Sequence, residues 1–136
     1  MIDFSDLEDA FLFVGSDQPF MNSAIVNKRT GETFYQSELS GIDDFPENFE
    51  GDNFIEIPHK NDLDLGRDLV FDFVSSHLPQ RLGEVDQIFR ARGAYHRFKS
   101  LLESVGLLEK WYSFEDEQIK SALRQWCKDN GLRIKE

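Results

Sequence analysis

The spacing of apolar residues changes near Asn61, and this change separates a strand-forming first half from a helical second half. Before it, β-branched and aromatic residues form short runs that turn residues separate. After it, apolar residues recur every three or four positions, as in Leu65, Leu69 and Phe73. Strands followed by helices predict a single α+β domain over residues 1–136. We expect a small antiparallel sheet of about three strands, covered by a helical C-terminal half of about four helices.

Two β-rich runs, residues 23–28 and 33–37, predict a hairpin. Gly31 lies between them and can adopt the positive φ that a tight turn requires. Residues 54–57 predict a third strand, which should end at Pro58 because proline has no N–H to donate to a sheet. The sheet is therefore built from the hairpin and one further strand.

A short helix over about residues 5–14 is predicted before the hairpin. Ser5 and Glu8 have the spacing of a capping box, and Gly15 is placed to close the helix in the left-handed conformation. In the second half, Pro79 and Gly93 separate successive helical patterns. We expect Ser113 to cap the last helix.

Residues 38–53, here called the acidic loop, are rich in Asp, Glu, Gly, Asn and Pro, with Phe45 and Phe49 interleaved. The composition predicts a loop that its aromatic residues attach to the core, and it leaves open whether the loop is mobile in the free protein. We take its carboxylates as candidate interaction residues: Asp43, Asp44, Glu47, Glu50 and Asp52.

The net charge of −11 is confined to the first half of the chain. Residues 1–62 contain 14 acidic and three basic residues, whereas residues 63–136 contain 12 of each. The sequence has no apolar run long enough to cross a bilayer and no basic segment after Met1, so we expect a cytoplasmic protein. The single cysteine, Cys127, allows neither an internal disulfide nor a four-ligand zinc site.

No catalytic signature is found, and we predict no catalytic, metal-binding or cofactor-binding residues. The nine glycines are never closer than ten residues apart, which excludes the phosphate-binding loops of the Walker and Rossmann types. The three histidines form no HExxH motif, and no GxSxG motif is present. An enzyme using dispersed carboxylates is a remaining alternative, because active sites need not be linear motifs.

A basic segment, residues 90–99, is the other candidate binding feature. It contains four cationic residues with no acidic residue among them, and it includes an aromatic and a histidine: Arg90, Arg92, Tyr95, His96, Arg97 and Lys99. Such a mixture can bind phosphate and stack on bases. The alternative is that Phe89 and Phe98 are core residues and that the arginines pair with acids of the same chain. The acids expected are notably Asp64, Asp68 or Asp72, or those of the N-terminal half.

Several motifs together resemble a bacterial family of unknown function, uncharacterised protein family 0158. They are the hairpin turn at residues 28–32, the stretch at 92–99, the aromatic cluster at 111–114, and Trp126 followed by residues 130–132. Where the family's hairpin usually has Asp before the arginine, this chain has Lys28. The resemblance implies a cytoplasmic bacterial protein and supplies no site residues.

These observations favour a non-enzymatic interaction module that presents its acidic N-terminal surface to a basic protein partner. The alternative function is binding of an anion or nucleic acid through the basic segment, although a chain of net −11 would repel a polyanion at long range.

Overall fold

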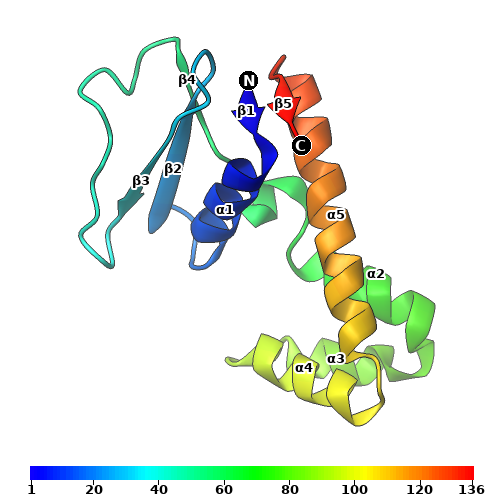
Figure 1. The fold of residues 1–136 in the computed structure, drawn as a ribbon. Helices are drawn as coiled ribbons and strands as arrows, with labels where there is room; N and C mark the ends of the chain where they lie inside the picture. The colour runs from blue at the N-terminus through cyan, green and yellow to red at the C-terminus, as the bar shows by residue number, and fades with distance from the viewer. The chain divides into compact units, whose positions relative to one another are not determined.

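The computed structural model describes residues 1–136 and confirms the α+β class, with an antiparallel three-stranded sheet and the helices concentrated in the second half (Figure 1). The chain divides into two compact units. The first comprises Met1–Leu63 and Lys120–Glu136, and the second comprises Asp64–Ile119. No helix combines the length and the apolar character that a membrane span requires.

The sheet of the first unit has the strand order β3-β2-β4, with β2 at Asn22–Asn27, β3 at Thr33–Ser37 and β4 at Phe54–Glu56. Both pairings are antiparallel, so the predicted hairpin and third strand are confirmed. Gly31 has φ +78° in the turn, and a Cβ at this position would lie 2.5 Å from the carbonyl oxygen of Met1. The turn therefore requires glycine for its backbone conformation and for the close approach of another segment.

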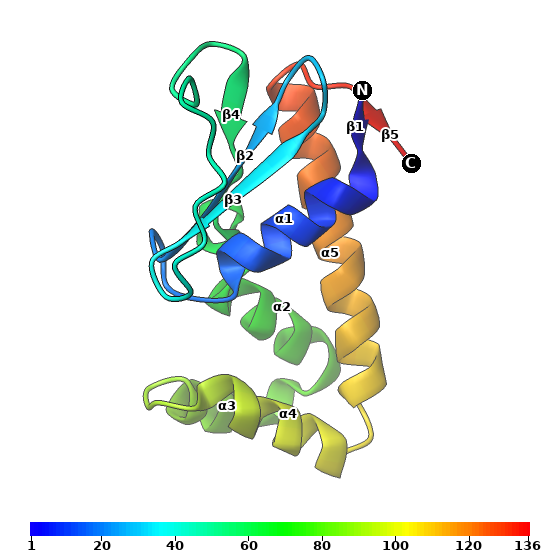
Figure 2. The ribbon, with the colours of Figure 1, turned by 60° about the vertical axis from the view of Figure 1, so that its left-hand side comes forward.

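Helix α1, Phe4–Gly15, lies across β2 and β3 (Figure 2). Its apolar face is buried: Phe4, Leu7, Ala10, Phe11 and Val14. The ring of Phe13 meets Tyr35 of β3 edge-on, with centroids 5.0 Å apart. One face of the sheet is thus covered by α1.

The predicted ends of α1 are wrong in detail. Asp3, not Ser5, is the N-cap: its Oδ1 accepts hydrogen bonds from the backbone N–H of Ser5 at 3.0 Å and from the Ser5 hydroxyl at 2.7 Å. The helix begins earlier than predicted because Asp3 is a strong cap two residues before the proposed one. Gly15 remains helical, and Ser16 ends the helix with its hydroxyl bonded to the carbonyl of Phe13.

Two short strands at the ends of the chain form a second, parallel sheet. β1, Ile2–Asp3, pairs with β5, Ile134–Lys135, and the backbone N–H of Ile2 donates to the carbonyl of Arg133. The C-terminal residue, Glu136, accepts hydrogen bonds from the guanidinium group of Arg124. The sequence did not predict this sheet.

The second unit contains the helices α2, Arg67–His77; α3, Leu82–Ile88; α4, Ala94–Ser104; and the start of α5, Leu108–Asp129. Short 3₁₀ turns at Lys60–Leu63 and Pro79–Arg81 precede α2 and α3. Aromatic rings fill the core of this unit, where Trp111 meets Phe73 and Phe98 edge-on at centroid distances of 5.4 and 5.1 Å.

The predicted start of the last helix is wrong. Ser113 lies inside α5, which begins at Leu108. The backbone N–H of Trp111 bonds to the carbonyl of Leu107, and burial of the Trp111 side chain draws this segment into the helix. Tertiary packing therefore overrides the local cap signal.

Candidate functional site

The acidic loop connects β3 to β4 in the first unit (Figure 1). All five candidate carboxylates on it are exposed, and no ion pair joins any of them to a lysine or arginine. The connection between β3 and β4 thus carries the five acidic residues that the sequence singled out: Asp43, Asp44, Glu47, Glu50 and Asp52.

A buried hydrogen-bond network fixes the start of the acidic loop. The hydroxyl of Ser37 donates to Oδ1 of Asn22 at 2.6 Å and accepts from the backbone N–H groups of Leu39 and Ser40, each at 3.2 Å. The side-chain amide of Asn22 in turn donates to the carbonyl of Phe13 at 3.2 Å. Because Asn22 and Ser37 are both buried, these bonds tie the loop directly to the core.

The loop then turns back along β3. Gly41 has φ +75°, and its N–H bonds to the carbonyl of Ser37. The N–H of Ser37 bonds to the carbonyl of Ile42, and the N–H of Asp44 bonds to the carbonyl of Tyr35. These bonds hold the backbone at Asp43 and Asp44 beside β3, the edge strand of the sheet.

The aromatic residues of the loop are only partly buried. The rings of Phe45 and Phe49 contact each other, with centroids 5.3 Å apart, and Phe49 remains 37% exposed. Leu39 and Ile42 are 60% and 42% exposed. The loop therefore presents apolar side chains among its carboxylates, whereas the sequence predicted that its aromatics would attach it to the core.

Phe45 and Phe49 line a pocket of about 450 Å³ on the face of the sheet opposite α1. Ile25 of β2 and Gln36 of β3 also line it, as does Glu56 of β4. None of the lining residues is basic. The sequence analysis missed the strand contributions, because they become neighbours only through the register of the sheet.

Comparisons with known proteins do not identify this chain. No family model, no curated protein and no solved structure matched it. The resemblance to uncharacterised protein family 0158 stays a prediction.

The basic segment belongs to the second unit, where two of its arginines have partners close by in the chain. Arg90 forms an ion pair with Asp86, one turn earlier, at 2.8 Å. The guanidinium group of Arg97 donates to the carbonyl of Arg92. Arg90 thus pairs with an acid of the same chain, as the alternative predicted. The acid is Asp86 rather than Asp64, Asp68 or Asp72, because the i,i+4 spacing places Asp86 nearer.

The aromatic residues of the basic segment take part in packing. The half-buried ring of Tyr95 meets the buried ring of Phe89 edge-on at 5.1 Å. Burial raises the pKa of Tyr95, an effect that Glu115 increases and Arg67 opposes. The ammonium group of Lys99 lies 5.6 Å from the ring centroid of Tyr112, and the backbone carbonyl of His96 accepts a bond from Ser100.

Two further residues of types that often take part in catalysis are buried. Cys127 is buried, and burial raises the pKa of its thiol to about 11. His59 is also buried, with Nε2 2.8 Å from the carbonyl oxygen of Asp17 and Nδ1 accepting from the N–H of Asn61 at 3.1 Å. These two bonds assign the proton to Nε2. No group of three or more His, Cys, Asp or Glu side chains is arranged to hold a metal ion.

Proposed function

We propose that the protein is a cytoplasmic, non-enzymatic interaction module that binds a basic segment of another protein through the acidic loop. The observation that carries the proposal is the arrangement of the five loop carboxylates, which are exposed and free of ion pairs on a connection whose start the Asn22–Ser37 network holds. Charges that the chain does not neutralise are available to a partner of opposite charge.

The apolar side chains on the same loop support this proposal. Leu39, Ile42 and Phe49 are exposed beside the carboxylates. Protein interfaces combine an apolar centre, which water leaves on binding, with a polar rim that determines orientation. A loop that offers both kinds of group fits a protein partner better than a small ion.

The basic segment supports nucleic-acid binding less well. Arg90 and Arg97 already interact within the second unit, and Tyr95 packs against Phe89 rather than standing free to stack on a base. A polyanion would also meet the excess negative charge of the chain. We therefore favour the acidic loop as the contact surface.

The test is capture of partners from a bacterial lysate by the immobilised full chain, followed by mass spectrometry. A loop variant would carry Asp→Asn and Glu→Gln substitutions at all five candidate positions. A control variant would lose the same number of charges from exposed positions in the second unit: Asp68, Asp72, Glu103, Glu109 and Glu117. Circular dichroism would establish that both variants fold.

We expect basic proteins to be captured by the wild type and by the control variant, and to be lost from the loop variant. Capture should also weaken as salt increases, because screening reduces the attraction between exposed charges. Equal capture by all three proteins would refute the proposal. Loss of a captured nucleic acid on changing Arg90, Arg92, Arg97 and Lys99 to Glu would support the alternative function instead.

A further inference from the structure

The pocket beneath the acidic loop has a floor that the sheet register determines. Ser23 of β2 pairs with Gln36 of β3, and Ile25 pairs with Glu56 of β4. Directly opposed residues in an antiparallel sheet point to the same face, so these four side chains share one surface. Ala24, between Ser23 and Ile25, points to the other face, where α1 packs. The pocket floor is therefore part of the hydrogen-bonded sheet.

The acidic loop and β4 supply aromatic walls. Phe45 and Phe49 contribute a pair of tilted rings from the loop, and Phe54 contributes a third ring from β4. The Phe54 ring is itself supported by Phe34, with centroids 6.0 Å apart. Rings from two separate segments thus line the same pocket. The π face of an aromatic ring attracts a cation.

Two carboxylates complete the pocket. Glu50 comes from the loop and Glu56 from β4, and both are exposed and free of ion pairs. With no basic residue in the lining, the site would repel phosphate and carboxylate groups. It would attract a positively charged group that can lie against a ring while donating to an oxygen.

Among the cations that proteins present, the guanidinium group fits these features best. It is planar, it is weakly hydrated enough to stack on aromatic rings, and it donates two parallel hydrogen bonds to one carboxylate. A lysine ammonium is strongly hydrated and has no planar face. The volume of about 450 Å³ lies within the range of about 300–1,000 Å³ that ligand pockets occupy.

We propose that this pocket receives an arginine side chain of the basic partner, an inference that rests on the proposed function above. The rings of Phe45, Phe49 and Phe54 contact the guanidinium plane, and Glu50 or Glu56 accepts its hydrogen bonds. The remaining loop carboxylates, outside the pocket, attract the rest of the basic segment.

The first experiment uses the ¹⁵N-labelled full chain and follows backbone amide resonances while a peptide is added. The probes are capped Gly-Gly-Arg-Gly-Gly and the same peptide with citrulline, which keeps the shape of arginine but carries no charge. We expect the arginine peptide to shift the amides of Ile25, Phe49, Gly51 and Glu56. The citrulline peptide should bind with an affinity at least about tenfold lower. Equal binding of both peptides, or shifts centred elsewhere, would overturn the inference.

The second experiment uses a pocket variant, Phe49→Leu with Glu56→Gln. Its matched control is Leu39→Ala with Glu47→Gln, which changes two exposed residues that do not line the pocket. Both positions of the pocket variant are exposed, so we expect the fold to survive, and dispersed amide resonances would show it. The arginine peptide should lose binding to the pocket variant only, and retained binding would contradict the inference.

Partner capture separates this inference from the function on which it rests. If the five-carboxylate variant loses the partner but the pocket variant retains it at wild-type level, the acidic loop is the contact and the arginine pocket is wrong. If the arginine peptide binds in the pocket but the five-carboxylate variant retains every partner, the proposed function is wrong, while the recognition of arginine stands.

Discussion

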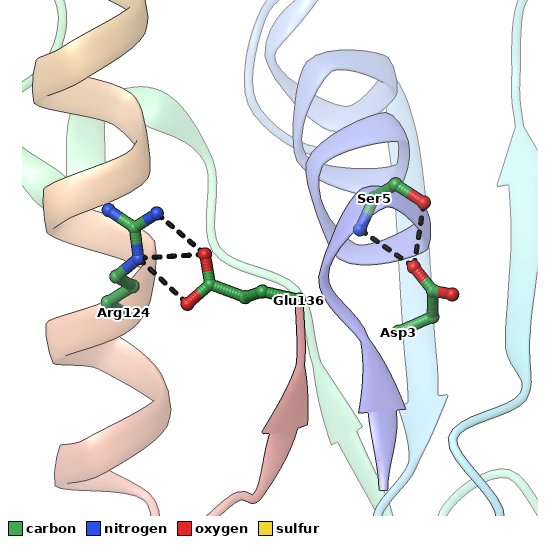
Figure 3. Close-up of polar contacts among 4 residues, drawn as sticks. All are labelled: Asp3, Ser5, Arg124 and Glu136. Atoms are coloured by element: carbon green, nitrogen blue, oxygen red, sulfur yellow. Dashed lines mark hydrogen bonds and ion pairs between the residues drawn. The ribbon is translucent and has the colours of Figure 1, made fainter.

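Ile2 pairs in register with Ile134, so the first and last strands of the chain lie side by side. Ile2 is 1% exposed, whereas Ile134 is partly exposed. This contact joins two segments at opposite ends of the sequence. Arg124 of α5 forms an ion pair with Glu136, the residue that follows β5 (Figure 3).

Ile2→Ala should lower the free energy of unfolding by about 2–4 kcal/mol, because it removes a fully buried side chain and leaves a cavity. Ile134→Ala should cost less, since its side chain is only partly buried. Urea unfolding of the two single variants and of the double variant would measure their coupling. Strict additivity would show that the two side chains do not stabilise each other.

The cap of α1 should make stability depend on pH. The hydroxyl and the backbone N–H of Ser5 hold the pKa of Asp3 below its ordinary range (Figure 3). A carboxyl group with a lowered pKa in the folded state contributes stability above its unfolded pKa, and that contribution is lost as pH falls through the folded pKa. Asp3→Ala should therefore lower the Tm at neutral pH, and the difference from wild type should disappear in acid.

Ser5→Ala is the control for this effect. It removes the hydroxyl donor and leaves the backbone donor of Ser5, so it should lower the Tm at neutral pH by less than Asp3→Ala. Thermal melts between about pH 2 and pH 7 would compare the three proteins. A Tm difference that does not change over this range would show that Asp3 does not act as a charged cap.

How far the sequence predicted the fold depended on how local each signal was. The hairpin was found because Gly31 and the two β-rich runs are adjacent in the chain. The pairing of Ile2 with Ile134 was missed, because two-residue strands have no periodicity and their partner lies at the far end of the sequence. Ser113 carries a cap signal but lies inside α5, since a local signal cannot show that Trp111 is buried.

The candidate site was predicted in part for the same reason. The loop carboxylates are contiguous in the sequence and visible in its composition, as at Asp43 and Asp44. The pocket forms because the sheet register places Ile25 beside Glu56 and because Phe49 of the loop lines the same space. Neither relationship can be read from residue types alone.

The thiol of Cys127 should be unreactive in the folded protein. Burial raises its pKa to about 11, so the thiolate fraction at pH 8 is about a hundredfold below that of a thiol with the ordinary value of 9.0. Alkylation by iodoacetamide should therefore be at least that much slower in the native state than in urea. Equal rates would mean that the helix carrying Cys127 opens readily.

Trp111 should tolerate replacement by phenylalanine better than by alanine. Its side chain is 1% exposed, and Nε1 has no hydrogen-bond partner, so Trp111→Phe loses no bond and removes an unsatisfied donor. We expect a cost of about 1–2 kcal/mol for Phe and about 3–5 kcal/mol for Ala. Urea unfolding followed by circular dichroism would measure both, and similar costs would argue for an unrecognised bond at Nε1.

Ser37→Ala tests whether the stability of the acidic loop affects partner binding. It leaves the buried Oδ1 of Asn22 without its Ser37 donor and removes the acceptor for the N–H groups of Leu39 and Ser40. An unsatisfied buried group costs about 1–3 kcal/mol, so unfolding should become easier by that amount. Hydrogen exchange at Leu39 and Ser40 should also accelerate. If the fixed loop matters for recognition, Ser37→Ala should weaken partner capture although every carboxylate is intact; unchanged capture together with faster exchange would show that the charges act without a fixed loop.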